Sequence, residues 1–264
     1  HMVSLEIINN IAYVTLNRPD KQNALSFEMF TLLDKHIKHI KKQRSIRAVV
    51  LRGEGEHFCS GLDVKSVMAK PFNIVKLLFK WLPGNANLVQ RVVLGWHTLP
   101  VPVIALMQGN SFGGGLHIAL GADIRIAKDN TQIAIMESRW GLCPDMGSSP
   151  LLLGLTQYDK ALLLSSQGEP INAEQACKLG LITEIVAEPE KRCHEIIEQL
   201  TTRSPDALAA IKRVNQASFH FNRRRVLAKE TWSQIRLLLS KNTRIAMHNA
   251  TKDDPKQYRL RGKW

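Results

Sequence analysis

The sequence contains few cysteines and no long apolar run. Its four cysteines are scattered and form no CxxC pair, a spacing that argues against a disulfide framework or a zinc site. We therefore expect no metal. No apolar run reaches the roughly 18 residues that a membrane-spanning helix needs, and the first ten residues lack the charged flank and apolar core of a signal peptide. These absences predict a cytoplasmic protein with no membrane partner.

Acidic residues are outnumbered by basic ones. The 264 residues include 36 Lys and Arg against 23 Asp and Glu, which gives a formal net charge of +13. Much of this charge lies in residues 34–47, 222–225 and 256–264. The excess predicts attraction to a polyanion such as nucleic acid, an anionic membrane or a phosphorylated ligand. A solvated basic face that only keeps the protein soluble is the alternative that we favour for most of it.

Strand patterns fill the first half of the chain. Residues 4–17 alternate apolar and polar side chains on either side of Asn9-Asn10, which predicts a hairpin. Short apolar runs that lead into loops are typical of strands buried on both faces. Further strands are expected at Arg47–Gly53, Val101–Gly109, Asp123–Ala127 and Ile182–Val186.

Helical patterns lie between and after these strands. Ser26 could cap an amphipathic helix that packs on the core. Its apolar face would consist of Phe30, Leu33, Ile37 and Ile40. Residues 73–100 are helical in period but contain Pro83-Gly84, so they predict two helices or one with a break. Strand signals vanish after Pro205, which predicts an α/β core followed by a helical C-terminal segment.

Two glycine-bearing loops follow buried strands, at His57–Lys65 and in "SFGGGLHIALG". Strand, glycine and helix is the layout of a phosphate loop, but Ile118 stands where GxGxxG needs its last glycine, and no GK[ST] follows. The first N–H groups of a helix are unpaired and lie at its positive end. Two such loops could aim two N–H groups at one oxygen that becomes negative. A tight turn that merely needs glycine is the alternative.

These loops resemble the signature blocks of the crotonase superfamily, the enoyl-CoA hydratases and isomerases. The blocks are "FCSGLDVK" and "PVIALMQGNSFGGGLHIALGADIRIA", with "NRPDKQNALS" before them and "INAEQACKLGLITEIV" after them in the family's order. The resemblance covers about residues 3 to 200. It implies an α/β fold, a spiral of repeated β-β-α units over residues 3–204, with a helical oligomerisation region at 205–264. It also implies a homotrimer or a hexamer made of two trimers.

The same resemblance implies an acyl-CoA thioester substrate, with coenzyme A as part of the substrate and no separate cofactor. By matching position, the N–H groups of Leu62 and Gly114 would form an oxyanion hole for the thioester carbonyl. Two aligned donors would stabilise the enolate that forms when a proton leaves C2. The positions that could contact coenzyme A are Arg18, Lys21, Ser60, Gly61 and Asp63.

The acidic residues of the pattern depart from the hydratases. Hydratases of this family use two glutamates; the second matches Glu137 in "MESRWGLCPDMG", but His117 stands at the first. An imidazole with an ordinary pKa of about 6.5 could act as a base, or it could line the pocket through a hydrogen bond. We expect hydratase activity to be weak or absent. A surface acid is the alternative for Glu137.

Asp145 follows Glu137 by eight residues, where typical hydratases have glycine. The pattern is similar to that of dienoyl-CoA isomerases, in which a glutamate and this aspartate move a proton between C2 and C6. A helix N-cap is the alternative for Asp145. Ser148 and Ser149 are interpreted as the entry to that helix, and Cys59 as a small buried residue.

We therefore predict an acyl-CoA double-bond isomerase of fatty-acid metabolism, with Glu137 as acid and base at C2 and Asp145 as the distal proton carrier. Four alternatives remain open. A Δ3,Δ2-enoyl-CoA isomerase needs only one glutamate, and an enoyl-CoA hydratase could use Glu137 with His117. A protein of this fold could also bind acyl-CoA without turnover. Some relatives are reported to bind RNA through a lysine-rich first helix, and residues 34–44 are similar, although no aromatic residues for base stacking are interleaved there.

Overall fold

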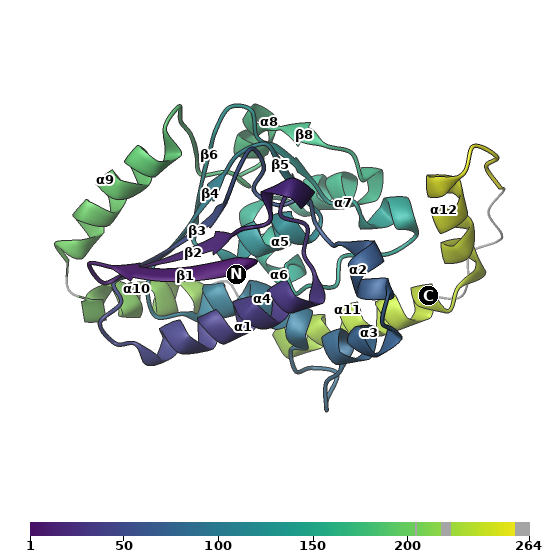
Figure 1. Ribbon diagram of the computed structural model, residues 1–264, viewed down its shortest axis with the longest axis horizontal. Coiled ribbons are helices and arrows are strands. Elements are labelled where there is room, and N and C mark those ends of the chain that lie inside the picture. The colour runs from purple at the N-terminus through teal and green to yellow at the C-terminus, as the bar shows by residue number, and fades with distance from the viewer. Residues whose placement is uncertain (204, 218–222, 257–264) are drawn as a thin grey trace.

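The computed structural model describes residues 1–203, 205–217 and 223–256 and shows two β-sheets among helices (Figure 1). The strands of the larger sheet lie in the order β1 (Val3–Ile8), β2 (Ile11–Leu16), β3 (Ala48–Gly53), β4 (Val103–Met107), β6 (Ile124–Ala127) and β9 (Glu184–Ile185). Only β1 and β2 are antiparallel; the other neighbours are parallel. The smaller sheet consists of β5 (Asn110–Phe112), β7 (Gln132–Ala134) and β8 (Ile171–Asn172).

The first hairpin forms as its sequence predicts. Asn9 and Asn10 have φ values of 50° and 65°, the positive values that a type I′ turn needs and that asparagine tolerates. Ile8 pairs with Ile11 across this turn. The prediction of a hairpin with its turn at Asn9-Asn10, ended by Arg18-Pro19, is confirmed, since β2 ends at Leu16.

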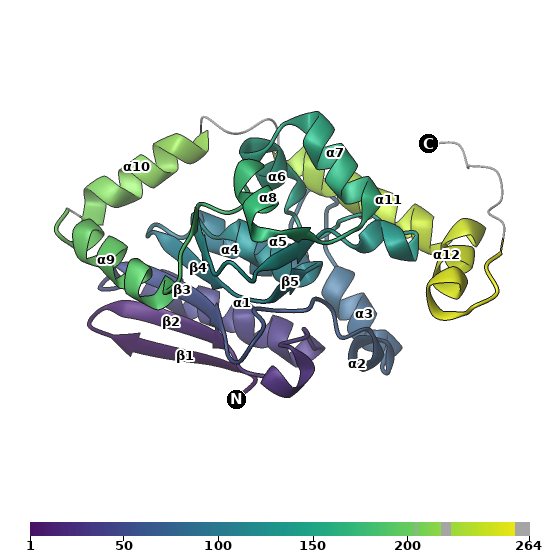
Figure 2. The same ribbon diagram turned by 90° about the horizontal axis from the view of Figure 1, so that it is seen from above.

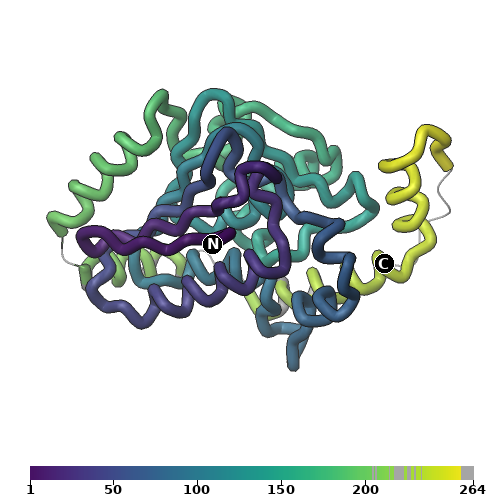
Figure 3. The backbone as a smooth tube through the Cα atoms, in the orientation of Figure 1, coloured from purple at the N-terminus to yellow at the C-terminus, as the bar shows by residue number. Residues whose placement is uncertain are grey.

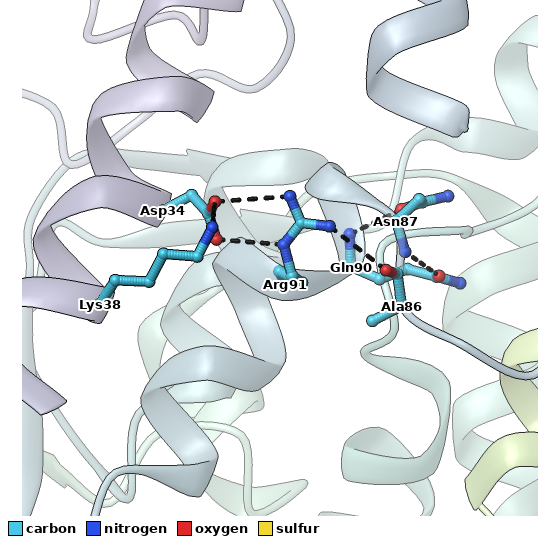
Figure 4. A network of polar contacts seen from close by, with 6 residues as sticks. All are labelled: Asp34, Lys38, Ala86, Asn87, Gln90 and Arg91. Carbon is cyan, nitrogen blue, oxygen red and sulfur yellow. Dashed lines mark hydrogen bonds and ion pairs between the residues drawn. The ribbon is translucent and has the colours of Figure 1, made fainter. Parts of the chain in front are cut away.

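The expected amphipathic helix is α1 (Phe27–Lys42). Ser26 caps it, because its Oγ accepts a hydrogen bond from the N–H of Met29 at 3.3 Å, and its predicted apolar face is buried. Asp34 on this helix accepts a hydrogen bond from Arg91 at 3.1 Å, which ties α1 to α4 (Leu88–Thr98) (Figure 4). A capping box of Asn87 and Gln90 begins α4.

The predicted break at Pro83-Gly84 is confirmed, since it lies between α4 and α3 (Pro71–Leu78). The short helix α2 (Val64–Met68) precedes α3 and was not predicted. The remaining elements before residue 204 are η1 (Pro19–Lys21), α5 (Gly114–Gly121), η2 (Glu137–Trp140), α6 (Ser149–Leu155), α7 (Tyr158–Gln167), α8 (Ala173–Lys178) and α9 (Pro189–Thr201).

Helices cover both faces of the larger sheet. Val49 and Leu51 of β3 belong to the main core that α1, α4 and α5 complete, whereas Val50 packs toward Cys193 and Ile197 of α9. Figure 1 shows α9 and α1 on opposite sides of β1 to β4. Burial on both faces explains why these strands read as continuous apolar runs.

The smaller sheet brings the two glycine-bearing loops together. A β-bridge joins Cys59 to Ser111, and the N–H of Phe112 donates to the carbonyl of Cys59 at 3.0 Å. The strand β5 lies beside α5 (Figure 2). Both loops therefore meet at the N-terminus of α5.

The C-terminal segment is helical, as predicted, with α10 (Pro205–Ala217), α11 (Arg223–Leu238) and α12 (Lys241–Thr251). Along the long axis of the molecule, α9 and α10 lie at one end and α12 lies at the other (Figure 3). Lys212 of α10 forms an ion pair with Asp123 at 2.7 Å, and Thr243 of α12 donates to the carbonyl of Gly141. All but the first residue of the basic tail at 256–264 lies outside the described residues, as does Asn222.

Within the described ranges, none of the helices combines the length and the hydropathy that a bilayer crossing requires. The boundary at residue 204 and the trimer stay predictions.

Candidate functional site

The two predicted donors of an oxyanion hole lie on adjoining backbone segments. Gly61 has a φ of 103° and Gly113 a φ of 49°, both in the region that favours glycine. A Cβ atom on Gly61 would lie 2.9 Å from the carbonyl oxygen of Phe112 and 3.7 Å from the amide nitrogen of Gly114. A side chain at residue 61 would therefore push the two loops apart.

The amide groups of Leu62 and Gly114 are available as donors. Around them, the N–H of Asp63 donates to Leu25 at 2.9 Å and that of Gly113 to Ala134 at 2.9 Å. In the described part of the chain, neither Leu62 nor Gly114 gives its N–H to another backbone group. Gly114 is also the first residue of α5, where the helix dipole favours negative charge. This arrangement suits an oxygen that gains charge.

His117 connects two other polar residues. It lies one turn into α5 and is 0% exposed. Its Nε2 is 2.5 Å from Oε1 of Glu137, the first residue of η2, and its Nδ1 is 2.6 Å from Oγ of Ser148. Both ring nitrogens therefore have partners. The surface-acid alternative for Glu137 does not hold, because this side chain is 17% exposed and bound to His117.

In the pair of Glu137 and His117, an ionised carboxylate beside a protonated imidazole is favoured over two neutral groups. Burial alone would lower the pKa of His117, but the carboxylate of Glu137 outweighs it and raises this pKa above its ordinary value. Burial alone would raise the pKa of Glu137, but the charge and the hydrogen bond of His117 lower it overall. Oε2 of Glu137 is buried and has no hydrogen-bond partner among the described residues. A carboxylate oxygen of this kind can accept a proton from a ligand.

Asp145 lies in the loop between η2 and α6 and has the opposite environment. Burial, together with the carboxylates of Glu230 and Glu137, raises its pKa to about 7. The N-cap alternative for Asp145 is wrong, because α6 begins at Ser149 with Ser148 at the cap position, as the sequence predicts. An acid with a pKa near 7 can both give and take a proton at neutral pH.

Glu230 on α11 is a residue that sequence reasoning missed. It is buried and accepts hydrogen bonds from Gln90 Nε2 at 3.1 Å, the N–H of Gly147 at 3.0 Å and Ser149 Oγ at 2.6 Å. Burial raises its pKa, although these hydrogen bonds oppose the shift. The only signal in the sequence is that Glu230 is the single acidic residue of the basic stretch that forms α11.

The hydroxyl of Ser148 on His117 was also missed, since the sequence predicts only a helix entry there. The structure describes no group of three or more His, Cys, Asp or Glu side chains that could hold a metal ion within its ranges. The site is thus built from backbone N–H groups, one imidazole and three carboxylates.

The predicted contacts to coenzyme A are only partly open. Arg18 forms an ion pair with Asp63 at 2.8 Å, and Asp63 caps α2 through the N–H of Ser66. Lys21 is exposed, whereas the N–H of Ser60 is bound to a backbone carbonyl. Lys21 is therefore the charged group with most freedom to meet a phosphate, and all these contacts stay predictions.

Cys59 is fully buried beneath the oxyanion loops. Its Sγ lies 3.1 Å from the carbonyl oxygen of Asn23, and burial raises its pKa to about 12. A thiol in this state is not a nucleophile. The interpretation of Cys59 as a small buried residue is confirmed.

Comparison with known proteins decides the family. A family model described as Enoyl-CoA hydratase/isomerase matches residues 6–253. The chain belongs to the enoyl-CoA hydratase/isomerase family. This match confirms the resemblance to the crotonase superfamily and extends through α10, α11 and all of α12. An acyl-CoA thioester is the substrate class expected of an enoyl-CoA hydratase/isomerase.

Relatives in this family carry the names of hydratases. The enoyl-CoA hydratase EchA19 of Mycobacterium tuberculosis (strain ATCC 25618 / H37Rv) is 32% identical over 202 residues, which cover 76% of this chain and 74% of the relative. The (E)-benzylidenesuccinyl-CoA hydratase of Thauera aromatica is 30% identical over 214 residues, or 80% of each chain. The solved enoyl-CoA hydratase from Bacillus halodurans has a TM-score of 0.82 at 24% identity and covers 95% of this chain and 98% of its own. That likeness confirms the predicted fold.

Proposed function

We propose that this enoyl-CoA hydratase/isomerase family member is an acyl-CoA double-bond isomerase. The observation that carries the proposal is the engagement of both nitrogens of His117, by Glu137 and by Ser148. A hydratase needs a second base that binds and activates water, and an imidazole with both nitrogens bonded offers no free position for it. Asp145, with its pKa of about 7, supplies a second proton carrier instead.

The first step forms an enolate. The thioester carbonyl accepts hydrogen bonds from the N–H groups of Leu62 and Gly114, and each such donor typically contributes about 2.7–4 kcal/mol to stabilising the charge. Glu137, held ionised by His117, takes the proton from C2 at its unpartnered Oε2. The C–H bonding electrons pass into the conjugated system and onto the thioester oxygen.

The second step returns a proton to the far end of the conjugated system. For a 3,5-dienoyl-CoA, protonated Asp145 donates to C6, the enolate electrons form the C–H bond, and the product is a 2,4-dienoyl-CoA. Glu137 then carries the proton that Asp145 has lost, and exchange between the two acids resets the site. Opposite pKa shifts of two neighbouring acids favour this division of roles.

Hydration is the second candidate. The hydratase names of the relatives and the 2.5 Å contact between His117 and Glu137 favour it. In that case His117 would leave Ser148 and share a water molecule with Glu137. The two candidates therefore differ in whether Asp145 or His117 accompanies Glu137.

A substrate comparison tests the proposal. Purified protein would be offered 3,5-dienoyl-CoA, 3-enoyl-CoA and 2-enoyl-CoA, and conversion would be followed by absorbance, with Asp145→Asn beside the wild type. We expect conversion of the dienoyl substrate that Asp145→Asn lowers about 100-fold. Fast hydration of 2-enoyl-CoA that is indifferent to Asp145→Asn would overturn it. Binding of acyl-CoA without any turnover would instead indicate a non-catalytic protein.

A further inference from the structure

The hydroxyl of Ser148 occupies the nitrogen of His117 that faces away from Glu137. The contact is 2.6 Å long, and Ser148 and His117 are 2% and 0% exposed. At this burial water does not compete for either group, so the hydrogen bond is maintained and is stronger than one at the surface. Losing it would leave a buried ring nitrogen unsatisfied.

The number of protons on His117 limits what Ser148 can do. A neutral imidazole has one N–H, and a carboxylate can only accept hydrogen bonds. The 2.5 Å contact with an ionised Glu137 therefore requires the proton on Nε2. Nδ1 then has a lone pair, and Ser148 satisfies it by donating its O–H.

A serine hydroxyl also suits the charged form of the ring. When His117 is an imidazolium, Nδ1 becomes a donor, and the same hydroxyl rotates and accepts from it. In both charge states Nε2–H keeps pointing at Oε1 of Glu137. Oε1 is thus always occupied, and Oε2, which is buried and without a partner in the described part of the chain, is left as the basic oxygen.

We propose that Ser148 is a positioning residue of the active site: its hydroxyl fixes His117 as an Nε2–H donor and thereby makes Oε2 of Glu137 the oxygen that accepts the substrate proton. The inference rests on Glu137 as the base, which is part of the proposed function. It also rests on Asp145 rather than water as the second partner, since in hydration His117 would leave Ser148. It also explains why His117, though placed like a base, does not act as one.

The chain supplies a matched control in the next residue. The Oγ of Ser149 makes a hydrogen bond of the same 2.6 Å length, but to Glu230. Ser148→Ala and Ser149→Ala therefore remove equal groups from neighbouring positions at the start of α6, and only the first removes a partner of His117. Ser148→Thr keeps a hydroxyl at the position.

The experiment combines steady-state kinetics with ¹⁵N and ¹H NMR of labelled histidine. In the wild type we expect a charged His117 with a strongly hydrogen-bonded Nε2–H. Ser148→Ala is expected to lower kcat roughly tenfold with KM unchanged, the size of one buried hydrogen bond, and to shift the His117 resonances. Ser148→Thr should restore both, and Ser149→Ala should leave the His117 resonances in place.

Several results would overturn the proposal. One is a wild-type His117 that carries its single proton on Nδ1, and this result needs no variant. Others are an unchanged kcat and spectrum in Ser148→Ala, or equal losses of kcat in both alanine variants with His117 unmoved. If Glu137→Gln stayed fully active while Ser148→Ala moved the His117 resonances, the proposed function would fail and the hydrogen-bond chain would remain as structure only.

Discussion

Glu137 and Asp145 are two carboxylates of one site with opposite surroundings. Glu137 has a cationic partner in His117, which lowers its pKa overall. Asp145 has burial and two further carboxylates around it, which raise its pKa to about 7. Residue type alone therefore does not assign a role: the neighbours make one acid a base at rest and the other a proton donor.

Removing the ionised partner should have the largest effect. Glu137→Gln keeps the size of the side chain but cannot accept the C2 proton, so we expect kcat to fall about 1,000-fold or more. Conversion of dienoyl-CoA and exchange of the C2 proton with deuterated water measure it. Affinity for acyl-CoA should change little, and a variant that retained a tenth of the activity would remove Glu137 from the chemistry.

Asp145→Asn should slow one of the two proton transfers and leave the other unchanged. Only a transfer to C6 needs the distal carrier, so dienoyl conversion should fall about 100-fold while exchange at C2 continues at a rate close to that of the wild type. The two rates are measured on the same protein sample. Equal losses of both rates would show that Asp145 shapes the pocket rather than moves the proton.

Glu230→Gln should bring the pKa of Asp145 closer to that of Glu137. Loss of this anion lowers the pKa of Asp145 from about 7 toward its ordinary value. Asp145 must be protonated to donate, so activity falls as pH rises through its pKa. In Glu230→Gln this fall in activity should occur at a lower pH than in the wild type. Each unit of decrease lowers the protonated fraction at pH 8 about tenfold. Ser149→Ala, which keeps the carboxyl group of Glu230 but removes one of its hydrogen bonds, is the comparison and should move the fall in activity less. A fall at the same pH in Glu230→Gln and the wild type would contradict the coupling.

The smallest expected effect is on stability and differs in sign between the acids. The folded chain binds the Asp145 proton more tightly than the unfolded chain, so this group's stabilisation is complete below pH 4 and is lost as pH rises through about 7. The Tm of Asp145→Asn should therefore rise relative to the Tm of the wild type as pH increases. By pH 8 this relative rise should amount to roughly 2 °C or more. Glu137→Gln should become less stable relative to the wild type as pH rises toward about 4.5 and should change no further above it, because the pKa of Glu137 is lowered below that ordinary value. Parallel curves for both variants would contradict the comparison.

Local rules predicted the elements that local interactions form. Asn9-Asn10 and the cap at Ser26 act within a few residues, and β3 and β4 are apolar because both of their faces are covered. The strands β5, β7 and β8 were missed, since two or three residues show no period. Of the expected strand at Ile182–Val186, only Glu184–Ile185 forms β9.

The candidate site likewise contains residues that the sequence identified and contacts that it did not reveal. Leu62, Gly114, Glu137 and Asp145 were named from the resemblance to the family's blocks, which are continuous in the sequence. The bond from Ser148 to His117 and the three hydrogen bonds of Glu230 join elements far apart in the chain. Such contacts depend on how helices pack, which no pattern within one segment records.

The position of Glu230 late in the chain also has a consequence for synthesis. Translation delivers the oxyanion loops, His117 and Asp145 well before α11. Until that helix has emerged and docked, Gly147, Ser149 and Gln90 lack their carboxylate, and Asp145 lacks one of the groups that raise its pKa. A nascent chain therefore completes its acid–base asymmetry last, because His117 can already pair with Glu137 before Glu230 reaches its place beside Asp145.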